Sequence, residues 1–598
     1  MDPNELTLLV QRDREAARRL IDGLSLDEAA PVLAQLPSRE LWQLIFLARN
    51  PTGLVRTLPR TTFFTLFHEV GPADSVELLP LATPRQVEFC LDLECWRRDE
   101  LATNRADEWI HRLREAGPRT LARHLAQLDF EFLIALFAGR VRVMKRNEDV
   151  DPVELDDPSL STFDDLYYFS FAEDVEANVA LELTQTLKVL RDRTPELTVD
   201  LFEALRQDLP AEVVEEARRL RDGRLADEGF PDFDRALETL ARLEVERFDL
   251  ERHRKLDPGS IGASTTGSEL VPVVNAEASF LVAALGALEA GVRAGVEREL
   301  AFLTNAVLVA TVRDFADMSE VHRQAVGTVS CLGLGLERLA RGDVASAAEL
   351  LREVRLEAIH RVGRTLVTDL VTRVTRLRRE TPLAAFGGRA TILGHVVART
   401  MDTLGATPPS YPQALDVEGE TGVRAFESLA DLERVDAVLT RGEALAVFLF
   451  HRLMPDPHEW QGMDLEGCTV DRLTDLSAHQ LVATMLANVL LAREARFEPI
   501  PVECLADLGE RVAAVLRPTA ASGALASAVE QWLEPLLDGL PLAVTGVVRR
   551  VVEECREALV TQLGAFPSES TVDPLAVPIV VVRAPELIAR TERDLPAM

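Results

Sequence analysis

Cysteine, aromatic residues and long uncharged runs are all scarce in this 598-residue sequence, and each shortage argues against a class of protein or structure. Six cysteines are too few for the disulfide framework of a secreted scaffold. The longest stretch without a charged residue, 476–492, spans 17 residues and contains several polar side chains, so it favours a buried helix over a membrane span. Aromatic residues make up 5% of the chain, and the one β-branched run, Ile579–Val582, predicts a short strand or an extended arm.

Positive charge is also in short supply. The chain has 98 acidic residues against 65 lysines and arginines, and the resulting net charge of −33 repels phosphate backbones, so we expect no nucleic-acid partner. The first twenty residues lack the cationic and then apolar segments of a signal peptide, so we expect a cytoplasmic protein with reduced thiols. About half of the net charge lies within 146–253. The acidic stretch 146–166 is either a solvated connector or a docking segment for a basic surface.

Apolar residues recur with a helical period through most of the chain. For example, leucines follow one another at intervals of three over 237–243, after Gly229-Phe230-Pro231 stops the preceding helix. Asp232 or Asp234 can cap the new helix by accepting its open amide donors. The sequence therefore predicts an all-α fold, with stacked short-helix repeats followed by further helical bundles and almost no β structure.

Clusters of Gly, Pro, Ser and Asp divide the chain into helical blocks. We predict a short-helix superhelical repeat domain at 1–145, an acidic connector plus helical domain at 146–255, a helical bundle at 273–403 and a C-terminal helical domain at 423–598. In the third block, residues 333–354 resemble the helix–turn–helix of a tetratricopeptide unit, with Gly342-Asp343 as the turn.

Short amphipathic helices, each closed by Leu-Pro or Leu-Asp, form a degenerate repeat over 20–137; LAQLP at 33–37 returns as LAQLD at 125–129. Capping boxes at Ser25 and Thr83 start two of these helices. Such helices are too short to be stable alone, so they must stack on one another. The pattern from Leu26 to Pro37 resembles the superhelical N-domain of MgtE-type magnesium transporters and, more loosely, the armadillo-like modules of the flagellar motor switch. This resemblance implies a superhelical stack, and it assigns no magnesium ligand here.

The whole chain is also similar to a family of large bacterial helical proteins without known function. The similarity rests on Asp164–Phe169 and on GFPDFDRALE at 229–238. It implies a helical fold and no particular activity.

Local catalytic motifs are absent from the sequence. No GxxxxGK[ST] loop, GxGxxG fingerprint or GxSxG elbow occurs, and neither His-Glu dipeptide (His68-Glu69, His458-Glu459) has the second histidine of a zinc-protease helix. Cys90 and Cys95 lie on consecutive turns but not on one helix face, which argues against a metal pair. His451, Asp456, His458 and Cys468 match no ligand spacing, so we interpret them as loop residues.

Two Glu-x-x-His motifs, Glu108/His111 and Glu357/His360, are the candidate metal ligands. Carboxylate and imidazole at this spacing share a helix face, and two such motifs on facing helices form the di-iron site of some helical bundles. Surface ion pairing or capping is the competing interpretation, because about one such match is expected by chance among ten histidines and two are unremarkable. We expect no bound cofactor.

Arginines gather along one helical stretch between 361 and 379. They form a solvated charged face, a dock for the chain's own acidic segment at 146–166, or a surface for an external acidic partner.

These observations favour a cytoplasmic helical scaffold or adaptor that binds other proteins, with no membrane insertion and no assigned catalytic residue. The alternatives are a metal-dependent helical enzyme and a divalent-cation-responsive regulator, whose sites would be assembled from distant residues.

Overall fold

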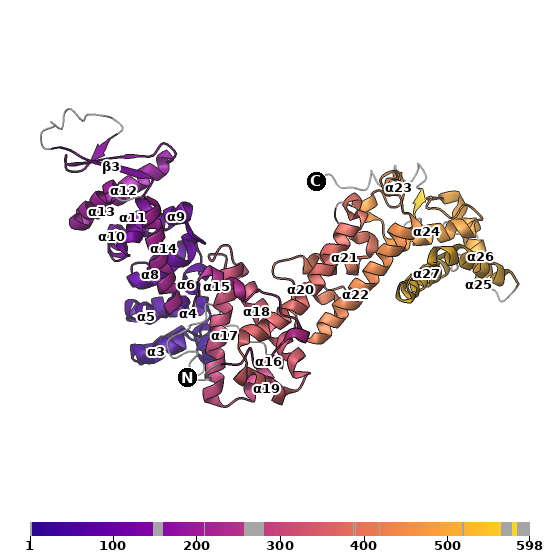
Figure 1. The fold of residues 1–598 in the computed structure, drawn as a ribbon, viewed down its shortest axis with the longest axis horizontal. Coiled ribbons are helices and arrows are strands. Elements are labelled where there is room, and N and C mark those ends of the chain that lie inside the picture. Colours follow the sequence, from indigo (N-terminus) through magenta and orange to yellow (C-terminus); the bar gives the residue numbers. More distant parts are fainter. Residues whose placement is uncertain are drawn as a thin grey trace. The chain divides into compact units, whose positions relative to one another are not determined.

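The structure is a computed structural model that describes residues 3–147, 160–207, 210–255, 280–386, 388, 390–417, 419–516, 520–563 and 577–582. The all-α prediction is confirmed, because helices dominate and the strands form small sheets only (Figure 1). The chain divides into two compact units, Met1–Arg364 (unit 1) and Thr365–Met598 (unit 2). The finer division into four blocks stays a prediction.

Unit 1 contains most of the short helices. Its helices are α1 Pro3–Arg12, α2 Arg14–Asp22, α3 Leu26–Leu33, α4 Ser38–Leu47, α5 Pro51–Thr57, α6 Arg60–Glu69, α7 Pro72–Ser75, α8 Pro84–Glu94, α9 Thr103–Glu115, α10 Pro118–Leu125, α11 Phe130–Phe137, α12 Ala177–Arg193, α13 Pro195–Gln207, α14 Pro210–Asp227, α15 Phe233–Glu238, α16 Phe280–Gly286, α17 Ala290–Thr311, α18 Met318–Ala340 and α19 Val344–Glu353.

Helix α20, Leu356–Glu380, has residues in both units. Unit 2 contains α21 His395–Leu404, α22 Leu429–Phe448, α23 Pro457–Gln461, α24 Ala478–Leu490, α25 Leu505–Leu516, α26 Ala520–Leu537 and α27 Leu542–Leu563.

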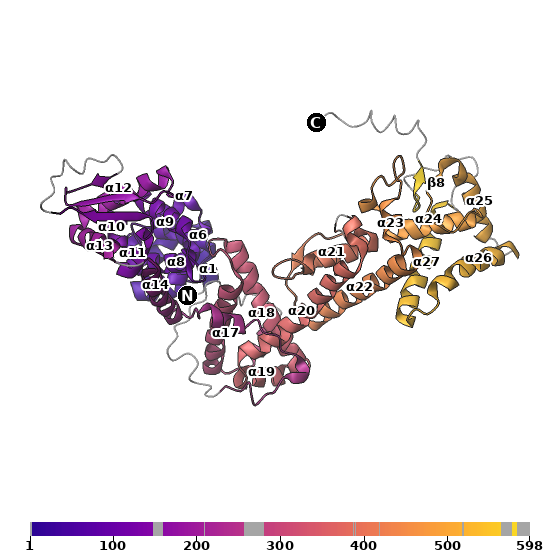
Figure 2. The same cartoon turned by 45° about the horizontal axis from the view of Figure 1, so that its top comes forward.

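Alternate helices of unit 1 contact one another, because short amphipathic helices must bury their apolar faces against neighbours. Contacts join α3 to α5, α4 to α6, α6 to α8 and α8 to α10, and Figure 1 shows α3, α5, α8 and α10 one above another. One apolar core runs through this stack, from Leu6 on α1 to Ala325 on α18. Helices α17, α18 and α19 pack together further along the unit (Figure 2).

Predicted caps and stops are in place. Ser25 and Thr83 each form a capping box, and Asp232 accepts from the amide of Arg235 at 3.0 Å. Gly229 adopts φ +85°, a backbone conformation that glycine allows, and ends the helix before it. Helix α15 stops at Glu238, so the leucine pattern predicted a longer helix than the chain forms.

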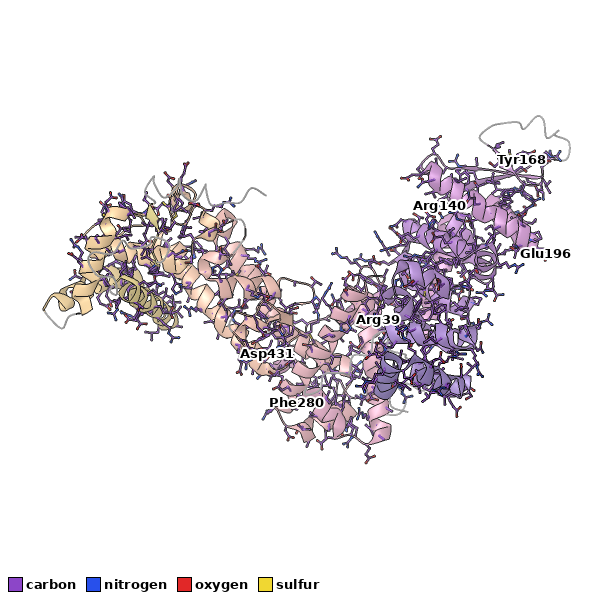
Figure 3. All side chains as sticks on the ribbon, turned by 180° about the vertical axis from the view of Figure 1, so that it is seen from behind. Arg39, Arg140, Tyr168, Glu196, Phe280 and Asp431 are labelled. Atoms are coloured by element: carbon purple, nitrogen blue, oxygen red, sulfur yellow. The ribbon has the colours of Figure 1, made fainter. Side chains whose placement is uncertain are left out.

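In the part of the chain that the structure describes, the strands lie in four small sheets. These pair β1 Trp96–Arg97 with β2 Glu100–Leu101, β5 Tyr167–Phe171 with both β3 Val141–Lys145 and β4 Ser161–Thr162, β6 Tyr411–Pro412 with β7 Val423–Arg424, and β8 Ile500–Pro501 with β9 Val581–Val582. Strand β9 confirms a short strand within Ile579–Val582. The β3–β5 pair was not predicted; it brackets the acidic stretch, and Figure 3 marks Tyr168 on β5 and Arg140 just before β3. Residues 148–159 of that stretch lie outside the described residues, so its docking role stays untested.

Candidate functional site

A cavity of about 580 Å³ lies within unit 1, where three segments distant in sequence meet. We call it the arginine pocket. Its lining comes from the end of α8 and the β1 turn, from α14, from the loop before α15 and from the end of α17: Leu93, Trp96, Arg97, Arg98, Arg221, Asp222, Leu225, Phe230, Pro231, Asp232, Phe233, Val309, Ala310, Thr311, Val312, Arg313, Asp314 and Phe315.

Two arginines of α14 bind Asp92 of α8 and so position one wall of the pocket. Arg224 donates to both carboxylate oxygens of Asp92, from Nε at 2.8 Å and from Nη2 at 2.7 Å, and the Asp92 side chain is 2% exposed. Arg221 Nε donates to the main-chain oxygen of Asp92 at 2.7 Å. Burial lowers the pKa of Arg221, and its guanidinium lies 5.7 Å from the centre of the Trp96 ring.

A tight hairpin presents the next two arginines. Trp96 is buried against Phe132, with ring centres 6.0 Å apart, which anchors the start of the hairpin. Arg98 has φ 59°, in the left-handed region, and this turns the chain from β1 into β2. Arg97 and Arg98 are therefore exposed at the turn, and the Arg98 guanidinium lies 4.9 Å from the centre of the Phe233 ring.

The loop before α15 supplies the aromatic wall. The turn at Gly229 carries the chain out of α14, and Phe230 becomes fully buried with its ring 5.7 Å from that of Phe89. Asp232 caps α15, so Phe233 enters the first turn at the edge of the pocket.

The end of α17 contributes open acceptors. Val312 N donates to Leu308 O at 2.8 Å, and this is the last bond of the helix. Within the described ranges, the carbonyl oxygens of Val309, Ala310 and Thr311 accept no hydrogen bond. They are the unsatisfied acceptors that a helix C-terminus leaves for water or a ligand.

The acidic residues of the pocket all have partners. Asp222 pairs with Arg221 at 2.9 Å and with Arg218, Asp314 pairs with Arg105, and Asp232 caps α15. Among the residues that the structure describes, no carboxylate lies within ion-pair distance of Arg97 or Arg313, and both are exposed. The pocket thus offers unpaired positive charge in a strongly acidic chain.

The two Glu-x-x-His motifs lie on different helices, α9 and α20. On α9, Glu108 pairs with Arg105 at 2.7 Å, and His111 Nδ1 lies 2.8 Å from Glu182. On α20, Glu357 lies 3.8 Å from Arg361, while His360 is buried. Over the described ranges, no three His, Cys, Asp or Glu side chains come together as a metal site requires, and this holds for the His451–Cys468 loop as well.

Two other sequence features receive a structural explanation. His68, the histidine of the first His-Glu dipeptide, has its Nε2 2.7 Å from Glu94 inside the helical stack. Five of the arginines between 361 and 379 make internal contacts. Arg361 and Arg364 donate to the carbonyls of Ala241 and Leu240 in unit 1, and in unit 2 Arg373 and Arg376 pair with Glu443 and Arg378 with Asp402.

Sequence reasoning missed the arginine pocket. Its one available signal was the segment 229–238, which the sequence marked as a helix stop and as part of a family resemblance, not as the wall of a site. Arg97 and Arg98 stand next to each other in the sequence, but nothing there assigns them to the same pocket as Arg313.

The class of protein is that of all-α proteins built from stacked helices. No helix in the described ranges is both long enough and apolar enough to cross a membrane. The chain belongs to a family of unknown function, DUF6178, whose family model matches residues 18–583. The predicted membership of an uncharacterised family is therefore confirmed. Searches of the curated proteins and of the solved structures find no match.

Proposed function

We propose that this protein is a helical scaffold or adaptor and that it binds a partner protein at the arginine pocket. The observation that carries the proposal is the pair of exposed, unpaired arginines, Arg97 and Arg313, at a cavity whose acidic residues are all engaged. Arginine is enriched at the energetically important positions of protein interfaces, where its guanidinium forms bidentate bonds with carboxylates.

The proposal includes a cytosolic location in a bacterial cell. All six cysteines are free thiols, which suits a reducing compartment. The resemblance to the MgtE-type N-domain, which stays a prediction, supports a stack of helices that presents surfaces to other proteins.

The test is affinity purification of the tagged full-length chain from its native host. Three proteins are compared by quantitative mass spectrometry: wild type, Arg97→Glu/Arg313→Glu, and the control Arg39→Glu/Arg119→Glu. The control makes the same charge change on two exposed arginines of unit 1 that do not line the pocket; Figure 3 labels Arg39.

We expect at least one stoichiometric partner that the control retains and the pocket variant loses. Identical partner sets for all three proteins would overturn the assignment to this pocket. Metal analysis of the same eluates tests the competing function, since about one or two transition-metal ions per chain would favour the enzyme.

A further inference from the structure

We propose that the arginine pocket takes an extended acidic peptide of the partner, with an aromatic residue between its carboxylates. This inference rests on the proposed function and specifies the chemistry of its partner.

The arginines select for carboxylates. Arg97 and Arg313 are exposed and have no carboxylate within ion-pair distance in the described part of the chain. They come from separate segments, the β1 turn and the residues after α17. A peptide with several acidic side chains can engage each guanidinium separately.

The end of α17 selects for a peptide backbone. The open carbonyls of Val309, Ala310 and Thr311 need N–H donors, and an extended chain carries such donors at regular intervals. A simple carboxylate has no donor for these carbonyls, and any small free anion placed against them would meet the negative end of the helix dipole.

The aromatic wall selects for an aromatic side chain between the acidic ones. Phe233 is half-buried at the pocket edge, with the Arg98 guanidinium 4.9 Å from its ring centre. A flat side chain inserted beside this pair would gain both ring contact and cation–π attraction.

Nucleic acid would also offer anions and flat rings, but the whole molecule disfavours it. The net charge of −33 repels a long phosphate backbone, whereas a short peptide meets only the local charge of the pocket.

The experiment measures the binding of a fluorescein-labelled peptide, Gly-Asp-Glu-Phe-Asp-Glu-Gly, blocked at both ends, to the full-length protein by fluorescence anisotropy. Two further peptides replace the acids with their amides or the Phe with Ala. A labelled single-stranded oligonucleotide of equal charge is measured in parallel. The proteins are wild type, Arg97→Glu/Arg313→Glu and the control Arg39→Glu/Arg119→Glu, each checked for an unchanged thermal melt.

We expect saturable binding of the acidic peptide that weakens with added salt. The pocket variant and the amide peptide should each weaken binding at least about tenfold, and the Ala peptide about threefold or more, while the control stays within about twofold of wild type. Equal loss in both arginine variants would mean non-specific charge attraction and would overturn the proposal. Oligonucleotide binding as tight as peptide binding, or no peptide binding at all, would overturn it too.

The two proposals fail separately. If the peptide does not bind but the pocket variant still loses a host partner, the scaffold function stands and the peptide chemistry is wrong. If the peptide binds as expected but no host partner depends on the pocket, the chemistry stands and the adaptor function is wrong.

Discussion

His124 and His360 are fully buried histidines of unit 1, and the fold keeps both neutral. Burial lowers the pKa of His124 to about 4, with the neighbouring Arg123 cation acting in the same direction. Burial likewise lowers the pKa of His360 to about 3, again with an arginine, Arg364, beside it. His124 Nε2 lies 3.0 Å from Leu79 O, the acceptor for its single ring proton.

Both shifts predict a loss of stability on mild acidification. The unfolded histidines titrate near pH 6.5, so below that pH the unfolded state binds protons that the folded state does not. The stabilisation is complete above pH 6.5 and falls as the pH drops towards 4 and 3. Between pH 7 and 5.5, we expect a loss of about 1.2 kcal/mol per histidine in the free energy of unfolding, measured by urea denaturation. His360→Gln should flatten this dependence by about half, and an unchanged slope in that variant would contradict the assignment.

At the residue scale, local chemistry was predictable and long-range pairing was not. The capping residues Ser25, Thr83 and Asp232 act within three residues of themselves, so their roles could be inferred from spacing alone. Arg224 and Asp92 are 132 positions apart, and no sequence pattern links them. The pocket depends on such pairs, which is why its residues were not foreseen.

At the element scale, two glycines allow α18 and α20 to cross with their backbones in contact. A Cβ on Gly335 would lie 2.0 Å from Ile359 O, and one on Gly363 would lie 1.8 Å from Cys331 O. The sequence contains no GxGxxG fingerprint, and no other motif assigns a role to Gly335. Its role is steric, because any side chain would push the helices apart.

Gly335→Ala should therefore destabilise unit 1 by about 3 kcal/mol, the upper end of what overpacking costs, because backbone atoms cannot give way as a flexible side chain can. The matched control is Gly295→Ala on α17, where a Cβ would meet nothing within 4 Å. That change should be neutral or stabilising by up to about 1 kcal/mol, since alanine has a higher helix propensity than glycine. Thermal melts of the two variants distinguish these outcomes, and equal melting temperatures would refute the steric argument.

Helices were easier to predict than strands for a physical reason. A helix closes its hydrogen bonds within its own sequence, whereas β3 needs β5, which lies across the acidic stretch. The short strand within Ile579–Val582 was foreseen from composition, but its partner β8 near Ile500 was not. The leucine period over 237–243 overextended α15 because periodicity alone does not show where a helix ends.

At the scale of the whole molecule, the chain divides into two units, each with buried residues of its own. The core of unit 1 includes residues from Leu6 to Ala325, and none of its members belongs to unit 2. A defect in this core should therefore loosen unit 1 and leave unit 2 protected.

The substitution Asp92→Asn introduces such a defect into unit 1. It removes a buried carboxylate that accepts two bonds from Arg224, and it should destabilise unit 1 by about 3 kcal/mol, because breaking a buried pair leaves the other charge uncompensated. Hydrogen exchange followed by mass spectrometry should show faster exchange in α8 and α14 and no change in α24 and α27 of unit 2. Asp227→Asn, on an exposed residue of α14, is the control and should change neither unit. If protection fell equally in both units after Asp92→Asn, the chain would unfold as one cooperative body, and the two units would not be independently stable.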